Sequence, residues 1–166
     1  MDEINMNAKS SPVEEHQLLT SWLAVIGMLT MYWSPVERHI DQCVHFLHGL
    51  QAQSKKTTKP TRLGSKLDFI KRNLPIGIID VQELEILMML TKDTVRIRDV
   101  CVHGVLNSYD QQKIEIGKVD GREGKYLIEN FTIDRNRLDR SAQALSALQM
   151  QWDSIASALL ERAHNA

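Results

Sequence analysis

The chain has 166 residues, which is the size of one compact domain. Hydrophobic residues make up 43% and charged residues 25%, a composition that excludes a fibrous or wholly disordered chain. The formal net charge of -1 confines any nucleic-acid-binding surface to a local patch. The two cysteines, Cys43 and Cys101, are too few for a disulfide framework and fit a reducing cytoplasm. The first residues lack the basic segment of a secretory signal, so we expect a cytoplasmic protein.

The N-terminal third is predicted to be helical. We expect residues 1–10 to be a disordered lead to a single domain over residues 11–164. Ser11-Pro12-Val13-Glu14 is typical of a capping box, in which Ser and Glu satisfy the first backbone N–H groups of a helix. This helix is expected to run to about Trp33. The same four residue types recur at 34–37, where either a second helix begins or one long helix is kinked at Pro35.

An uncharged stretch within this region bears on localisation. No Asp, Glu, Lys or Arg occurs between Glu15 and Glu37, and residues 18–33 are mostly apolar. That core is shorter than the ~20 residues of a membrane-spanning helix, and its flanks carry Glu instead of a basic cluster. Small residues at Thr20, Ala24 and Gly27 favour close packing against another helix. We therefore expect a buried or interface helix, and no contact with a membrane.

Helical periodicity continues through the middle of the chain. Apolar residues keep helical spacing at Val36, Ile40, Cys43, Val44, Leu47 and Leu50. This helix is predicted to end near His48-Gly49, before a polar loop over residues 51–65. A short helix is expected over residues 66–74, stopped by Pro75. Asp80 is the predicted N-cap of a long helix that ends at His103-Gly104, because Gly is favoured just after a helix.

The C-terminal part changes period twice. Apolar residues alternate with polar ones over residues 113–119 and 125–133, on either side of Asp120-Gly121-Arg122-Glu123-Gly124, which predicts a β-hairpin. Helical spacing returns after Asp134, at Leu138, Leu145, Leu148, Trp152, Ile155 and Leu159. The predicted fold is therefore all-α: a bundle of four to five helices with a small hairpin, about 113–133, inserted before the last helix.

The long helix that begins after Asp80 carries the most informative polar residues. Four of them form a narrow polar strip at i, i+4, i+7 and i+11: Lys92, Arg96, Asp99 and His103. Arg98 instead falls on an apolar face, between Val95 and Val102. A guanidinium in that place needs a carboxylate, a phosphate or solvent at an interface, because burying it unpaired is costly.

The end of this helix, Arg98-Asp99-Val100-Cys101-Val102-His103-Gly104, resembles the HEPN superfamily. The hallmark of that superfamily is an Arg, usually followed by a polar residue, and then a His after four to six residues. The resemblance extends over residues 15–162 and includes Trp33-Ser34-Pro35-Val36-Glu37, Leu63-Gly64-Ser65-Lys66-Leu67 and the hairpin and helix that follow His-Gly. Arg96 also satisfies the spacing; Arg98 is preferred because Asp99 follows it.

The resemblance implies a metal-independent endoribonuclease, in a toxin or defence role, with Arg98, Asp99 and His103 as catalytic residues and no cofactor. His can act as base or acid near neutral pH, and a guanidinium matches a phosphate with two hydrogen bonds. Arg98 and His103 point ~140° apart on an ideal helix. They converge only if His103 leaves helical geometry or if two chains combine their motifs, as family members commonly do across a two-fold interface.

Two other functions stay open. One is a non-catalytic HEPN-like interaction module that binds a nucleotide, RNA or a partner protein. The other is a helical adaptor in which Arg98 and Asp99 form a local ion pair and the helix dipole favours His103 at the helix end. The expected partners are a second copy of the chain, RNA, and an antitoxin or other regulatory protein.

Basic residues outside the motif are candidates for phosphate contacts. The expected RNA- or phosphate-binding residues are Lys55, Lys56, Lys59, Arg62, Lys66, Lys92 and Arg96. For those in the loop, a solvated connector is the alternative interpretation. The loop lacks an aromatic residue before Phe69, which argues against base stacking there.

Zinc-like spacings occur on the second helix. His39 and Cys43 are four residues apart, and His45 and His48 are three apart. Because Cys43 lies on the apolar stripe and His45 does not, the four do not converge on one face, and no metal site is expected. Cys101 is expected to be a core thiol.

Overall fold

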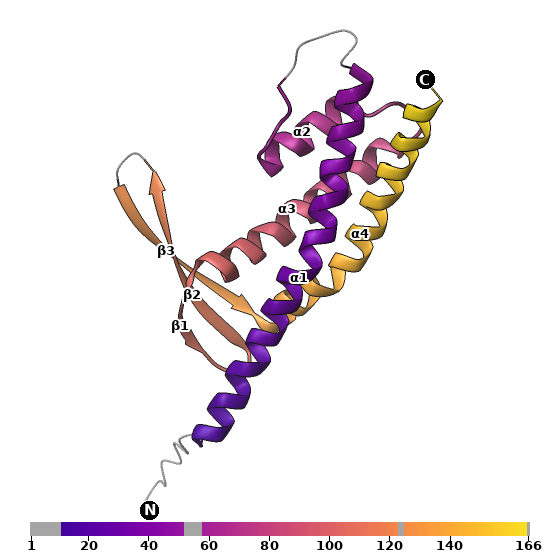
Figure 1. Cartoon of the computed structure of the whole chain (residues 1–166). Coiled ribbons are helices and arrows are strands. Elements are labelled where there is room, and N and C mark those ends of the chain that lie inside the picture. Colours follow the sequence, from indigo (N-terminus) through magenta and orange to yellow (C-terminus); the bar gives the residue numbers. More distant parts are fainter. Residues whose placement is uncertain (1–10, 52–57, 123–124, 166) are drawn as a thin grey trace, which may run out of the picture.

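The computed structural model describes residues 11–51, 58–122 and 125–165, and it is mostly helical with one small sheet (Figure 1). The helices are α1 (Pro12–Gln51), α2 (Leu63–Asn73), α3 (Val81–His103) and α4 (Arg135–His164). The strands are β1 (Val105–Tyr109), β2 (Lys113–Arg122) and β3 (Lys125–Asp134). The helical bundle and its hairpin are as predicted. The expected lead over residues 1–10 lies outside the described residues.

Helix α1 settles the question raised by Pro35. The chain forms one continuous 40-residue helix with this proline inside it. The predicted capping box begins it: the Ser11 N–H donates to Glu14 Oε2 at 2.8 Å, and the Glu14 N–H donates to Ser11 Oγ at 3.3 Å. Trp33 and Val36, on either side of the proline, are buried. Packing of these neighbours holds the helix together where the proline removes a backbone hydrogen bond.

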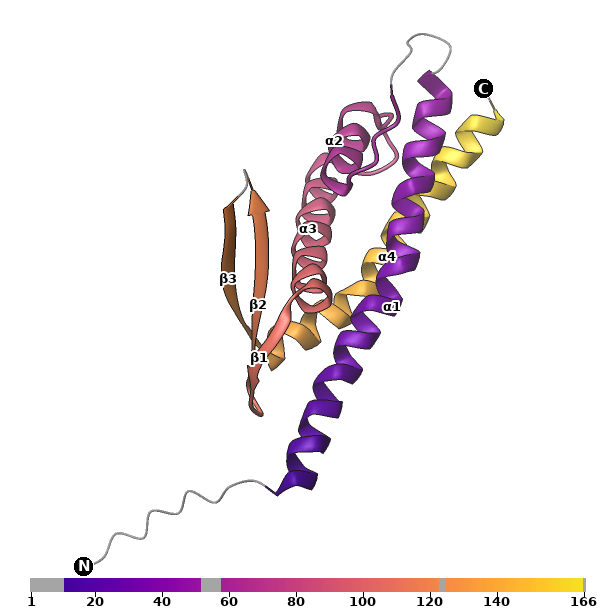
Figure 2. The ribbon, with the colours of Figure 1, turned by 60° about the vertical axis from the view of Figure 1, so that its left-hand side comes forward.

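The elements form three layers (Figure 2). The hairpin stands on one side of α3, and the long pair α1 and α4 lies on the other, with α2 near the start of α3. The core between the helices is apolar and includes all three tryptophans. The indole N–H of Trp152 on α4 donates to Thr91 Oγ1 on α3 at 3.0 Å. This bond satisfies a polar group that burial would otherwise leave without a partner.

Two aspartates start the helices that flank the sheet, as their sequence positions predict. Asp80 Oδ1 accepts from the N–H of Gln82 at 2.7 Å and from that of Glu83 at 3.4 Å. Asp134 Oδ1 accepts from the Arg137 N–H at 2.7 Å. Each carboxylate occupies the N-cap position, where it accepts hydrogen bonds from backbone N–H groups. Its negative charge also interacts favourably with the positive end of the helix dipole.

The sheet is antiparallel in the order β1-β2-β3, so it has one strand more than the predicted hairpin. In the β2–β3 pairing, Ile114 lies opposite Ile133, Ile116 opposite Phe131, and Lys118 opposite Glu129. The three isoleucines are buried. Because side chains alternate along a strand, these three pairs share the face of the hairpin turned toward α3.

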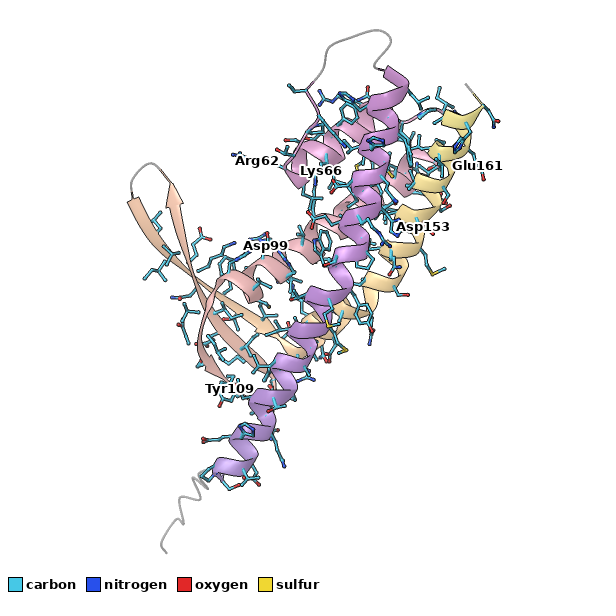
Figure 3. All side chains as sticks on the ribbon, viewed as in Figure 1. Arg62, Lys66, Asp99, Tyr109, Asp153 and Glu161 are labelled. Carbon is cyan, nitrogen blue, oxygen red and sulfur yellow. The ribbon has the colours of Figure 1, made fainter. Side chains whose placement is uncertain are left out.

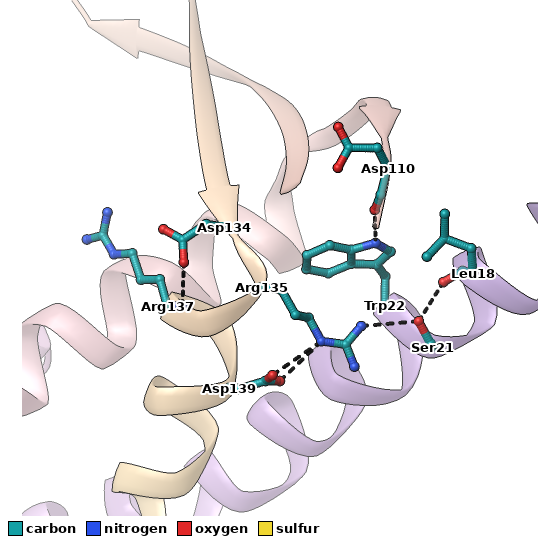
Figure 4. Close-up of polar contacts among 8 residues, drawn as sticks. All are labelled: Leu18, Ser21, Trp22, Asp110, Asp134, Arg135, Arg137 and Asp139. Atoms are coloured by element: carbon teal, nitrogen blue, oxygen red, sulfur yellow. Dashed lines mark hydrogen bonds and ion pairs between the residues drawn. The ribbon is translucent and has the colours of Figure 1, made fainter. Parts of the chain in front are cut away.

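A polar junction joins the base of the sheet to α1 and α4 (Figure 4). The indole N–H of Trp22 donates to the Asp110 carbonyl at 2.8 Å. The Arg135 guanidinium lies over the same indole, 4.9 Å from the ring centre. Arg135 also donates to Asp139 Oδ1 at 3.3 Å and to Ser21 Oγ at 3.1 Å. The junction fixes the base of the sheet against both long helices.

By length and composition alone, α1 meets the criterion for a helix that can cross a membrane. Of its most apolar window, 28% is buried inside the fold. The core helix of a soluble protein meets the same criterion, so this finding is weak evidence about localisation. Trp22, Leu29 and Trp33 of α1 are buried.

Candidate functional site

The end of α3 is held against β2 by Gly104. This glycine has an extended backbone (φ -91°, ψ 169°) in place of a left-handed one, so close packing explains its need for glycine. A Cβ there would overlap Ile116 Cγ2 and lie 2.6 Å from the Val100 carbonyl oxygen. The fold therefore fixes where the last turn of α3, and His103 with it, meets the sheet.

Arg98 finds its counter-ion in its own neighbour. Its Nη1 lies 2.8 Å from Asp99 Oδ1, and the Arg98 side chain is 25% exposed. The Nε of Arg98 is buried and has no hydrogen-bond partner within the described part of the chain. The guanidinium thus retains hydrogen-bonding capacity that the ion pair does not use.

His103 stands apart from this ion pair. It is exposed in the last turn of α3, and its imidazole makes no hydrogen bond or ion pair with any residue that the structure describes. Asp99 and His103 are four residues apart on α3, a spacing at which side chains can touch, but the Asp99 carboxylate binds Arg98. A single chain therefore does not bring Arg98, Asp99 and His103 into one contacting cluster.

A groove does bring together part of the polar strip with residues of the hairpin. The α3–hairpin groove has a volume of about 510 Å³ and is lined by Val95, Arg96, Asp99, Val100, Lys118, Glu129 and Phe131. At 100° per residue, His103 lies on the same side of α3, ~20° from Arg96 and ~40° from Asp99. Arg96, the arginine that the sequence ranked second, therefore faces the groove.

The hairpin residues that line the groove were not among the site residues predicted from the sequence. Lys118 lies two residues after Ile116 on β2, and Glu129 lies four residues before Ile133 on β3, so strand alternation places both on the α3 side. Phe131 lies opposite Ile116 and is half-buried. Charged residues at inward positions of a predicted hairpin are the signal that could have identified this wall.

The other expected phosphate-binding residues are dispersed. Lys59, Arg62 and Lys92 are exposed, and Lys55 and Lys56 lie outside the described residues. Lys66 is 8% exposed, with its Nζ 2.6 Å from Asp41 Oδ1 and 3.9 Å from Glu37 Oε1. Figure 3 labels Arg62 and Lys66 at the start of α2 and Asp99 on α3. The Lys66 ammonium thus pairs with two carboxylates of α1, and unlike the exposed basic residues it is not available to a phosphate.

The histidines and thiols with zinc-like spacing have other surroundings. His39 is buried, with its Nδ1 3.0 Å from Gln42 Oε1 and 3.4 Å from Asp153 Oδ1. Burial raises the pKa of the Cys43 thiol to about 12 and that of Cys101 to about 11. Within the described ranges, no three His, Cys, Asp or Glu side chains form a group that could hold a metal ion.

Comparisons with protein-family models, with curated proteins and with solved structures found no match to this chain.

Proposed function

We propose that the protein is a cytoplasmic, metal-independent endoribonuclease of the HEPN type, acting in a toxin or defence role. The observation that carries the proposal is the end of α3, where an exposed histidine lies on the same side of the helix as the α3–hairpin groove. His103 is accessible to a substrate, and Arg96 and Lys118 line the groove beside it. Arg98 lies nearby with a buried, unused Nε.

The chemistry requires three functions from these groups. A base takes the proton of the ribose 2′-OH, and the 2′-oxygen then forms a bond to phosphorus. The bond from phosphorus to the 5′-oxygen breaks, and an acid gives that oxygen a proton, leaving a 2′,3′-cyclic phosphate. The imidazole of His103 can serve as the base or as the acid in these transfers. The guanidinium of Arg98 suits the charge on the phosphorane, and Asp99 holds that guanidinium in place.

Two proton transfers call for two histidines, and we propose that a homodimer supplies them. The N-terminal half of α1 leaves an apolar face uncovered: Leu23 is 55%, Met28 44% and Met31 75% exposed. The same face is free of charged residues between Glu15 and Glu37. A second copy that covered this face would remove it from water. An antitoxin or other regulatory protein is a further proposed partner.

The test is cleavage of a generic single-stranded RNA in the presence of EDTA. We expect the parent protein to cut, and His103→Ala to lose activity by ~100-fold or more, the usual contribution of a general acid or base. The matched control is His45→Ala, which removes an exposed histidine of α1. Circular dichroism should show both variants folded. Equal rates for His103→Ala and the parent would refute the ribonuclease proposal.

The Arg98–Asp99 ion pair favours one alternative, a non-catalytic interaction module that binds RNA, a nucleotide or a protein. The Asp99 carboxylate competes with a substrate phosphate for the Arg98 guanidinium, and its negative charge repels the phosphate. RNA binding without any turnover would support this second function. Asp99→Asn then gives a further distinction: loss of the carboxylate charge should change the rate of cleavage in an enzyme and change only binding in a module.

A further inference from the structure

We infer that the α3–hairpin groove binds one nucleotide of a single-stranded RNA, with its phosphate on Arg96 and Lys118 and its base against Phe131. This inference rests on the proposed function and deepens it, because it names the surface that holds the substrate. Arg96 comes from α3 and Lys118 from β2, so the two cations approach the groove from opposite walls.

The walls of the groove change character along the hairpin. Near its base, the inward face is closed by buried Ile114, Ile116 and Ile133, which pack as core. One pair further toward the tip, the inward positions are Lys118 and Glu129. The hairpin therefore stops contributing to the core and opens at the level where α3 presents Arg96 and Asp99.

The charges of the groove match a single phosphodiester. Arg96 and Lys118 contribute two positive charges and Glu129 one negative charge. The Asp99 carboxylate also lines the groove and is paired with Arg98 at 2.8 Å. With Arg98 included, the five charged side chains carry a net charge of about +1, which suits one phosphate of an RNA backbone, whereas a triphosphate would need more cations. The volume of about 510 Å³ lies within the range usual for small-ligand sites.

Phe131 offers a surface for a base. It is half-buried in the groove, and Val95 and Val100 of α3 provide the apolar surface across from it. A base reaches an aromatic ring inside such a groove only when it is unpaired and unstacked from its neighbours, which selects a single strand. His103 lies further along the same side of α3, so a nucleotide in the groove would bring an adjoining phosphodiester toward the imidazole.

The test measures binding separately from cleavage. The probe is a fluorescent single-stranded oligonucleotide with 2′-O-methyl sugars, which lacks the 2′-OH needed for cleavage. Anisotropy titrations from 50 to 200 mM salt give its Kd and the salt slope. Lys118→Ala and Arg96→Ala should each weaken binding severalfold and lower the slope by about one. The matched control is Lys113→Ala, which removes an exposed lysine from the same strand outside the groove. An unchanged Kd for both groove variants would overturn the inference.

Phe131 needs its own design, because it also packs against the core. Phe131→Leu should weaken binding ~10-fold, the order of one lost stacking contact, and Phe131→Trp should restore it. Thermal melts of both variants separate loss of stacking from loss of folding. The inference is supported if Phe131→Leu binds the probe more weakly while its melting temperature equals that of the parent. It is contradicted if the parent, Phe131→Leu and Phe131→Trp bind the probe equally.

The two proposals can fail independently. If the 2′-O-methyl probe needs Lys118 and Phe131 but the all-ribose RNA stays intact, the groove inference stands and the ribonuclease proposal fails. If all-ribose RNA is cut while the groove variants bind and cut like the parent, the nuclease stands and the groove inference fails. Absence of any RNA binding by the parent refutes the groove inference.

Discussion

Two arginines two positions apart acquire different roles from their position on one helix. Arg96 faces the α3–hairpin groove, whereas Arg98 points ~140° from His103 and binds its neighbour Asp99. The motif pattern favours Arg98 because a polar residue follows it. In the structure, Asp99 forms an ion pair with the Arg98 guanidinium, whereas Arg96 lines a groove together with Lys118.

Gly104 gives the residue-scale prediction. Gly104→Ala should lower the free energy of unfolding by about 1–3 kcal/mol, because the new Cβ would overlap Ile116 Cγ2. The control is Gly49→Ala, in the C-terminal part of α1 outside the proposed interface, where a Cβ would meet nothing within 4 Å. That change should stabilise the fold by about 0.5–1 kcal/mol through helix propensity. Urea unfolding curves measure both, and equal effects of the same sign would contradict the packing argument.

At the scale of elements, local signals decide where helices begin. Asp80 caps α3 by accepting hydrogen bonds from two backbone N–H groups. The other end of the helix carries Arg96, Asp99 and His103. The start of α3 and the proposed site are therefore separated by almost the whole helix. A change at the cap should affect stability and leave the chemistry of the site alone.

We expect Asp80→Ala to cost about 1 kcal/mol of stability, since it removes the acceptor for Gln82 and Glu83. Asp80→Asn should retain most of that stability, because an amide oxygen still accepts. Thermal or urea unfolding followed by circular dichroism distinguishes them. RNA binding and cleavage at 25 °C should match the parent in both variants, and a loss in the folded Ala variant would link the cap to the site.

Much of the element order could be predicted from local sequence because it depends on local chemistry. The capping box, the aspartate N-caps and the alternation around residues 113–133 each act within a few residues. Strand β1 could not be predicted, because Val105–Tyr109 lacks alternation and is held by pairing with β2. Continuation of α1 through Pro35 likewise depends on distant packing partners. Strand alternation could have placed Lys118 and Glu129 on one face of the hairpin, but their position across from Arg96 depends on how α3 and the hairpin pack.

At the scale of the molecule, the uncovered face of α1 departs from a self-contained bundle. Leu23, Met28 and Met31 lie on one side of a helix whose opposite side is buried against the core. A monomer would leave this uncharged face in water. The proposed homodimer accounts for it and would also provide the second histidine.

Light scattering at micromolar concentration should therefore show a dimer for the parent. Met31→Glu should shift it to a monomer, because a charge would be buried at the centre of the uncharged face. The matched control is Met150→Glu, a methionine of α4 that is similarly exposed, at 70% against 75%. This variant should stay dimeric. A monomeric parent, or equal behaviour of both variants, would count against an interface on α1.

The three buried indoles give the chain a set of internal optical probes. Their N–H groups meet three different acceptors: the Asp110 carbonyl for Trp22, the Glu37 carboxylate at 3.2 Å for Trp33, and the Thr91 hydroxyl for Trp152. Trp22 also lies under a guanidinium. Variants that keep one indole at a time would report on the sheet junction, the middle of α1 and the α3–α4 contact. Emission from each would show whether the sheet detaches from α1 before the bundle itself opens.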